Sequence, residues 1–292
     1  MILSIVTINY NNAEGLRKTL ASVAAQTYRD IEHIIIDAAS SDGSAEVIME
    51  YESLNHSSVR PLTIKWTSEP DGGIYAGMNK GIRKAMGNYV QILNSGDILA
   101  ADDVTERMFA ALSTLNIQHS TENGIPILYG NMLKSYDGKT IINRDTCGNR
   151  MYTPESFLYF YKGTLNHDCA YIRRDLFDKY GLYNEQMKIC SDWEWYVRAI
   201  VLGGEKPVYT NIDVTIFDMN GVSESRGKNA DLIKKERREY LEKILPPAVL
   251  HDYDTFSVPI LQYQRLKKYH LWGLVYFMER VLFKLEKWKV LR

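Results

Sequence analysis

Polar side chains that could bind a cation or a phosphate follow apolar segments at three points of the first hundred residues. These polar stretches are Asn9-Tyr10-Asn11-Asn12, Asp37, and Asn94-Ser95-Gly96-Asp97. Ligands of open α/β sheets bind outside the carboxyl ends of the strands, and hard cations prefer carboxylate oxygens. We therefore expect Asp97 to bind a metal ion, and the acids and amides at these strand ends to form a nucleotide site.

Strands and helices that alternate along the chain are expected to position these residues. β-Branched and aliphatic residues favour the strands, and apolar residues spaced by three and four favour the helices between them. The expected strands are 3–8, 31–36, 62–66 and 89–93, and the expected helices lie around 16–24, 47–51 and 74–86. This alternation predicts an α/β fold with a mostly parallel, Rossmann-like central sheet and helices on both faces.

Two common nucleotide-binding motifs are missing from the sequence. No Gly-x-Gly-x-x-Gly follows the first expected strand, and no Gly-x-x-x-x-Gly-Lys-Ser/Thr occurs anywhere. A dinucleotide dehydrogenase or a P-loop enzyme is therefore a poor fit.

The second half of the chain is less regular. Residues 127–129 and 140–142 are expected to be strands, and Asp175 is expected to lead a helix. A further helix is expected to open at Ser191-Asp192, with one of these two residues as its N-cap. The polar segment 220–228 marks a boundary between a catalytic domain, 1–224, and a C-terminal helical extension, 225–292.

The composition is that of an ordinary soluble protein. The chain has 292 residues, of which 45% are hydrophobic, and a net charge of −1, which argues against bulk nucleic-acid binding. Three cysteines without CxxC spacing predict a reduced, cytoplasmic compartment and no zinc site. We find neither a signal peptide nor a run of 18 apolar residues, so no membrane span is expected.

The last 28 residues are strongly basic and rich in apolar side chains. Residues 265–292 contain eight Lys and Arg residues and two Glu residues, a net charge of +6. Aromatic and aliphatic residues interleave with these charges, which is typical of a helix that lies on an anionic membrane face. The alternative is a helix that packs on the catalytic domain or on another subunit, including a second copy of the chain.

Five motifs in order resemble glycosyltransferase family 2, the inverting, nucleotide-sugar-dependent enzymes of the GT-A fold. The resemblance covers roughly residues 2–224. Its motifs are Ser4-Ile5-Val6-Thr7-Ile8-Asn9-Tyr10-Asn11, Ser22-Val23-Ala24-Ala25-Gln26-Thr27-Tyr28, Ile36-Asp37-Ala38-Ala39-Ser40-Ser41-Asp42-Gly43, Glu69-Pro70-Asp71-Gly72-Gly73-Ile74-Tyr75 continuing to Met78-Asn79-Lys80-Gly81, and Leu93-Asn94-Ser95-Gly96-Asp97.

The resemblance implies a donor site in the first hundred residues. It implies that Asp37 faces the base, most often uracil, and that Asp97 coordinates the Mg²⁺ or Mn²⁺ that bridges the diphosphate. The other donor-site residues that it implies are Thr7, Asn9, Tyr10, Asp71, Asn79, Ser95 and Gly96. Members of the family usually have further acids beside the last one, and Asn94-Ser95-Gly96-Asp97 keeps a single carboxylate.

The resemblance also implies a catalytic base in the second half. Ser191-Asp192-Trp193-Glu194 matches the position of the family's acidic pair, so we expect Asp192 to be the base, with Glu194 as the alternative. His167 matches a histidine of the acceptor side. Arg226 and Lys228 are expected on a loop that closes over the donor phosphates.

Together these observations predict inverting transfer of a sugar from a nucleotide sugar, with a UDP-sugar as the expected donor, to a sugar hydroxyl of a glycan. The expected setting is surface polysaccharide assembly on a polyprenyl-diphosphate carrier at the inner face of the cell membrane. A catalytically degenerate sugar-nucleotide-binding or scaffold module is an alternative, favoured by Gly96 and Ser191 at usually acidic positions. A sugar nucleotidyltransferase fits less well, because Asn9-Tyr10-Asn11-Asn12 is not its glycine-rich basic loop.

Overall fold

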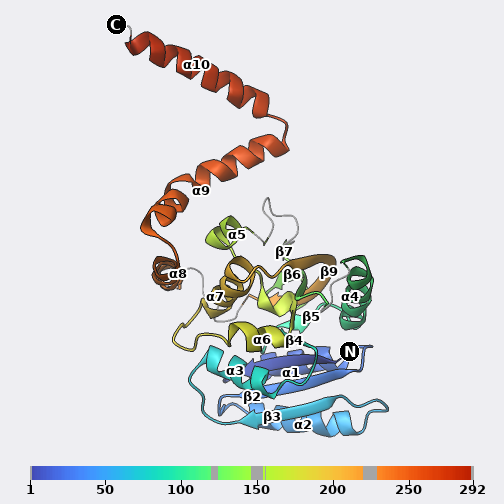
Figure 1. Ribbon diagram of the computed structural model, residues 1–292. Helices are drawn as coiled ribbons and strands as arrows, with labels where there is room; N and C mark the ends of the chain where they lie inside the picture. Colours follow the sequence, from blue (N-terminus) through green and yellow to red (C-terminus); the bar gives the residue numbers. More distant parts are fainter. Residues whose placement is uncertain (1, 120–123, 146–153, 155, 220–228, 291–292) are drawn as a thin grey trace. The chain divides into compact units, whose positions relative to one another are not determined.

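A computed structural model describes residues 2–119, 124–145, 154, 156–219 and 229–290 (Figure 1). In its N-terminal half, parallel strands alternate with helices as expected from the sequence. The central strand pairs in parallel with a strand on each side, and a fourth strand extends the sheet. These elements are β1 (Leu3–Asn9), α1 (Ala13–Ala24), β2 (Ile31–Asp37), α2 (Ser44–His56), β3 (Thr63–Ser68), α3 (Ile74–Lys84) and β4 (Tyr89–Ile92).

Helices cover both faces of this parallel part. Successive side chains of β1 point to opposite faces of the sheet, and each face packs against a helix. On one face, Val6 packs closely against Gly81 of α3. A Cβ atom added to Gly81 would lie only 2.2 Å from Cγ1 of Val6. On the other face, the Thr7 hydroxyl lies 2.9 Å from His33 Nε2, whose ring bonds to Tyr51 of α2. Both β1 and β2 are buried along their whole length, as in parallel sheets covered on both sides.

The second half adds strands that run in both directions relative to the first four. β8 (Ala170–Arg173) is antiparallel to both β4 and β6 (Ile127–Ser135), and β9 (Pro207–Asp218) runs parallel to β6. The strand order is β3-β2-β1-β4-β8-β6-β9-β5, with β7 beside β6. The short strands are β5 (Ile98–Leu99) and β7 (Asn143–Asp145).

The strand expected at 140–142 is wrong by three residues. β7 begins at Asn143 because Asp137 holds the preceding residues in a turn. The Oδ1 atom of Asp137 accepts hydrogen bonds from the backbone N–H groups of Lys139 and Thr140, at 2.8 and 2.6 Å. Side-chain bonds of this kind compete with strand pairing.

The helices of the second half range from α4, with 16 residues, to single short turns. They are α4 (Val104–His119), α5 (Phe157–Lys162), the 3₁₀ turn η2 (His167–Cys169), α6 (Asp175–Tyr180), α7 (Ser191–Tyr196) and the π-helical turn η3 (Val197–Leu202). The expected N-cap of α7 is wrong. Cys190 occupies the cap position, without a side-chain cap bond, and Ser191 Oγ instead accepts the Asn184 N–H at 2.5 Å.

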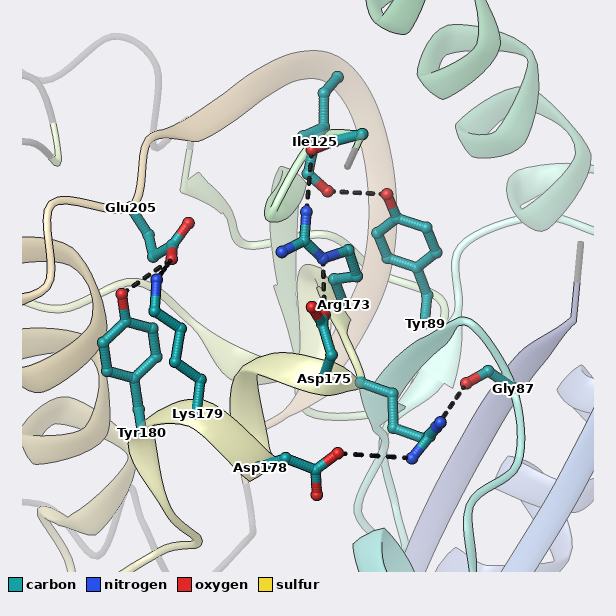
Figure 2. Close-up of polar contacts among 11 residues, drawn as sticks. Gly87, Tyr89, Ile125, Arg173, Asp175, Asp178, Lys179, Tyr180 and Glu205 are labelled. Atoms are coloured by element: carbon teal, nitrogen blue, oxygen red, sulfur yellow. Dashed lines mark hydrogen bonds and ion pairs between the residues drawn. The ribbon is translucent and has the colours of Figure 1, made fainter. Parts of the chain in front are cut away.

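Two arginines fix the turn from β8 into α6 (Figure 2). Arg173 donates to Asp175 Oδ1 at 2.6 Å and to the Gly124 carbonyl at 3.1 Å. The guanidinium of Arg174 donates to the Gly87 carbonyl, just before β4, at 3.1 Å. These bonds tie β8 to the start of β4, and β8 directly follows η2.

The chain divides into two compact units, Met1–Tyr240 and Leu241–Arg292. The boundary expected at 224/225 falls outside the described residues. The remaining helices are α8 (Ala230–Ile244), α9 (Pro247–Lys268) and α10 (Trp272–Val290). Within the described residues, no helix has the length and apolar character that a membrane crossing requires.

Candidate active site

The carboxyl ends of β1 and β2 bring Asn9 and Asp37 together, as the sequence predicts. The two residues are register partners, and Asn9 Nδ2 donates to Asp37 Oδ1 at 2.7 Å. The same carboxylate accepts bonds from the Ser40 N–H and from the Ser40 and Ser68 hydroxyls. Burial by itself would raise the pKa of Asp37, but these hydrogen bonds outweigh it and lower the pKa. Asp37 is thus a rigid, ionised acceptor at the sheet edge.

Thr7 and Tyr10 lie in contrasting environments. Thr7 is fully buried and bonds to His33, whose pKa falls to about 3 because the ring is buried. The Tyr10 side chain is 68% exposed at the sheet edge. The Tyr10 ring is therefore accessible to a bound base, whereas the Thr7 hydroxyl is already used in the core.

The turn after β4 is held by Thr19 of α1. Gly96, with φ of +108°, donates its N–H to Thr19 Oγ1 at 2.9 Å, and this hydroxyl donates to the Asp97 carbonyl at 2.8 Å. The Ser95 N–H bonds to the Ile8 carbonyl of β1 at 3.1 Å. Glycine suits this turn because its φ lies in the region that other residues rarely adopt.

Two buried carboxylates lie close enough to repel each other at this end of the sheet. Asp97 is 4% exposed, and its pKa is raised well above the usual value by burial and by the charge of Asp168. The pKa of Asp168 is also raised by burial, although His167 and the Thr215 hydroxyl at 2.9 Å oppose the rise. Asp218 is a third acid nearby. Its charge also raises the pKa of Asp97, whereas its backbone N–H, which donates to Asp97 Oδ1 at 3.0 Å, lowers that pKa.

This crowding of negative charge fits a bound divalent cation. A cation would offset the repulsion that burial and neighbouring acids impose on Asp97. The described residues contain no cluster of three or more His, Cys, Asp or Glu side chains placed to hold a metal. A divalent cation at Asp97 would need water and substrate phosphates as further ligands, as Mg²⁺ sites commonly do.

Asp192, in the first turn of α7, contacts two groups from distant parts of the chain. Its Oδ2 atom lies 3.2 Å from His167 Nδ1, and its Oδ1 atom lies 3.1 Å from the Tyr75 hydroxyl. Burial opposes ionisation of Asp192, but the bond and charge of His167 outweigh it and lower the pKa. Asp192 is therefore ionised at neutral pH.

His167 is the positive partner of this carboxylate. Burial lowers its pKa, but the hydrogen bond and charge of Asp192 prevail and raise the pKa to about 9. Its Nε2 atom lies 3.2 Å from Asn94 Nδ2, and Asn94 Oδ1 is buried without a hydrogen-bond partner in the described structure. Since amide orientation is assigned from hydrogen bonding, the flipped amide would satisfy both Asn94 Oδ1 and a protonated Nε2.

Glu194, the alternative base, is engaged in a buried ion pair. Its two carboxylate oxygens lie 2.8 and 2.9 Å from the Arg198 guanidinium, one turn along the helix. Glu194 is 5% exposed, so this pair is part of the core. The geometry therefore favours Asp192 as the reactive acid.

Two of the expected donor residues already have partners within the protein. The Asn79 amide donates to the Tyr183 carbonyl and to Glu185, and its oxygen accepts the Tyr183 N–H. Asp71 Oδ1 accepts the Gly73 N–H at 2.9 Å. Their roles toward a donor stay predictions, and Arg226 and Lys228 lie outside the described residues.

Sequence reasoning assigned no role to Tyr75, Asp168 or Asp218. Tyr75 belongs to a quoted motif, and its position one helical turn before Asn79 was the available signal. Asp168 follows His167 directly, and that adjacency was the available signal. Asp218 ends β9, and nothing in its local sequence connects it to β4.

The protein has an α/β fold with a mixed sheet. Acids lie at the carboxyl ends of its first strands, and a further acid lies at a helix start in the second half of the chain. This combination defines the GT-A class of glycosyltransferase. Solved structures share this fold. S. aureus TarS in complex with UDP-GlcNAc superposes with a TM-score of 0.61 at 16% identity, covering 91% of this chain and 73% of that one. The mannosyltransferase PcManGT from Pyrobaculum calidifontis, in complex with GDP-Man and Mn²⁺, gives 0.58 at 17% identity, covering 93% and 72%.

The chain belongs to glycosyl transferase family 2, whose family model matches residues 4–181. An uncharacterized glycosyltransferase of Mycobacterium tuberculosis is 31% identical over 231 residues, which is 78% of this chain and 79% of the relative. A PGL/p-HBAD biosynthesis glycosyltransferase of Mycobacterium bovis is 25% identical over 198 residues, 68% of this chain and 69% of that protein. The protein is a glycosyltransferase.

Proposed function

We propose that the protein transfers a sugar from a nucleotide-diphosphate sugar to a sugar hydroxyl with inversion, and that Asp192 is the general base. The observation that carries this proposal is the ionised Asp192 carboxylate held by His167 and Tyr75. A base that is already ionised at neutral pH can accept a proton in the transition state.

Different residues of the chain accept the proton, stabilise the leaving diphosphate and orient the nucleotide. The acceptor oxygen bonds to the anomeric carbon, its proton passes to Asp192, and the bond from the anomeric carbon to the diphosphate oxygen breaks. A divalent cation at Asp97 would stabilise the negative charge of the departing diphosphate. Asp37 and Asn9 orient the nucleotide at the edge of the sheet, and the exposed Tyr10 ring lies beside them.

We propose UDP as the nucleotide and a lipid-linked glycan as the acceptor. The resemblance of the Asp37 motif to uracil-binding members supports the first point, and TarS was solved with UDP-GlcNAc. The relative named for PGL/p-HBAD biosynthesis supports an acceptor carried on a lipid. Mg²⁺ or Mn²⁺ is the proposed cofactor, in line with the Mn²⁺ of PcManGT.

The test is donor turnover by the purified full chain with UDP-, GDP- and dTDP-sugars in the presence of Mn²⁺. We expect turnover of one donor, and we expect Asp192→Asn to reduce kcat by about 10²- to 10⁴-fold, the usual contribution of a general base. NMR of the product should show the opposite anomeric configuration to the donor. Full activity of Asp192→Asn would refute the assigned base. Absence of both binding and turnover with every donor would favour the scaffold alternative.

A further inference from the structure

A row of large apolar side chains on α10 is exposed. The row, called the α10 stripe here, consists of Leu274, Phe277, Met278, Val281, Leu282 and Leu285. Their exposed fractions run from 40% for Val281 to 65% for Phe277. Spacings of three and four residues place them on one side of the helix, so the stripe is a continuous apolar surface rather than scattered side chains.

Positive charges accompany the stripe. Arg280 and Lys284 are exposed, lie one turn apart, and follow Phe277 by three and seven residues. Lys267 and Lys268 are exposed at the end of α9. Long cationic side chains of this kind can extend from an apolar surface toward anionic groups.

We propose that the α10 stripe lies on an anionic lipid surface. An amphipathic helix with a basic polar side and Phe and Leu on its apolar side binds at the boundary between headgroups and acyl chains. A second copy of the chain is a poorer occupant, because it would bring two segments of net charge +6 together. Paired helices usually place opposite charges beside the apolar contact. A membrane-bound α10 would keep the enzyme at the surface that holds a lipid-linked acceptor.

The test is flotation of the full chain with vesicles of phosphatidylcholine alone and with added phosphatidylglycerol. We expect binding to the anionic vesicles that weakens as salt is raised. Each Lys or Arg near such a surface contributes about a fivefold change in binding, so Arg280→Gln with Lys284→Gln should weaken binding about 30-fold. Leu274→Ser with Leu282→Ser should abolish it.

Val59→Ser is the matched control, because this valine is 99% exposed and lies in the catalytic unit. It should leave vesicle binding unchanged. Equal binding to neutral and anionic vesicles, or no binding by folded protein, would overturn the proposal. A dimer in sedimentation that the Leu274 and Leu282 substitutions dissociate, without vesicle binding, would assign the stripe to a second copy.

A different observation concerns Glu236 of α8. Its carboxylate, buried at 9% exposure, accepts the backbone N–H groups of Lys188, Ile189 and Cys190 at 2.6, 3.1 and 3.0 Å. These three consecutive residues lead directly into α7, whose second residue is Asp192. One side chain thus holds the segment that carries the proposed base.

The same segment also positions the other partner of Asp192. The Ile189 carbonyl lies 2.6 Å from the Tyr75 hydroxyl, which is 3.1 Å from Asp192 Oδ1. We infer that Glu236 is a positioning residue for Asp192, an inference that rests on the proposed function. Loss of its carboxylate would leave three N–H groups without their acceptor and would shift Asp192 relative to Tyr75.

The test compares kcat and the donor KM of Glu236→Ala with wild type. A displacement of about 1 Å can cost about 10²-fold in rate, so kcat should fall by about 10- to 100-fold. The donor KM should change less than about twofold, because Asp37 and Asp97 lie on other elements. Glu236→Gln keeps one acceptor oxygen and should therefore give an intermediate kcat. It replaces Glu236→Ala in this test if the alanine variant does not fold.

Glu239→Ala on the same helix is the matched control, since that side chain is 55% exposed. In an Asp192→Asn background, Glu236→Ala should reduce kcat no further. Unchanged kcat in Glu236→Ala, or an equal loss in the Asp192→Asn background, would overturn the inference. Full activity of Asp192→Asn would instead refute the proposed function, so the two failures are distinguishable.

Discussion

Replacing His167 with glutamine should change how the free energy of unfolding depends on pH. The contact with Asp192 raises the pKa of His167 from 6.5 to about 9. A raised pKa means that the folded state binds the proton more tightly than the unfolded chain does. The resulting stabilisation is fully present below pH 6.5 and is lost as pH rises through about 9. At about 1.4 kcal/mol for each tenfold difference in proton affinity, it amounts to about 3 kcal/mol.

The assay is urea unfolding of wild type and His167→Gln at pH 6, 8 and 10, in EDTA. Wild type should exceed the variant by about 3 kcal/mol at pH 6, and by much less at pH 10. The substitution also removes the charge that lowers the pKa values of Asp97 and Asp168, so these two acids contribute to the difference as well. His56→Gln is the matched control, because His56 is exposed at the end of α2. A wild-type advantage that stays constant from pH 6 to 10 would refute the ion pair.

Three further substitutions separate the roles of neighbouring residues. Asp97→Asn should abolish the Mn²⁺-dependent increase in stability that a saturating UDP-sugar gives, about 2.7 kcal/mol at a hundredfold excess over Kd, measured by thermal shift. Glu194→Gln should lower the free energy of unfolding in urea by about 3 kcal/mol, because Arg198 loses its buried partner, while the folded protein keeps its turnover. Gly81→Ala should cost about 1 to 3 kcal/mol in urea unfolding, because the added methyl would overlap Val6.

Each of these predictions has a contradicting result. A metal-dependent shift that survives Asp97→Asn would place the cation elsewhere. Loss of turnover in folded Glu194→Gln would move the base from Asp192 to Glu194. Gly273→Ala is the control for Gly81→Ala, since an added Cβ would meet nothing within 4 Å, and equal effects of the two would refute the packing argument.

The strands, helices and parallel pairing of the first half were predictable because their signals are local. Apolar residues predominate in β1, β2 and β4, and each strand ends in residues that stop it. Parallel pairing then places the strand ends at one edge, so the contact of Asn9 with Asp37 followed from strand order. The turn that delays β7 was missed because it depends on how one aspartate bonds to the backbone.

The sequence by itself determined the fold class, the family and the residue types at the sheet edge, since these depend on pattern and motif order. Tertiary structure decided which acid pairs with which partner. Asp192 and Glu194 are two residues apart and chemically alike, yet one meets His167 and the other meets Arg198. Likewise, β9 brings Asp218 to Asp97 across 121 residues. Such contacts, and the pKa values they set, depend on long-range strand pairing and burial, which no local pattern of residues encodes.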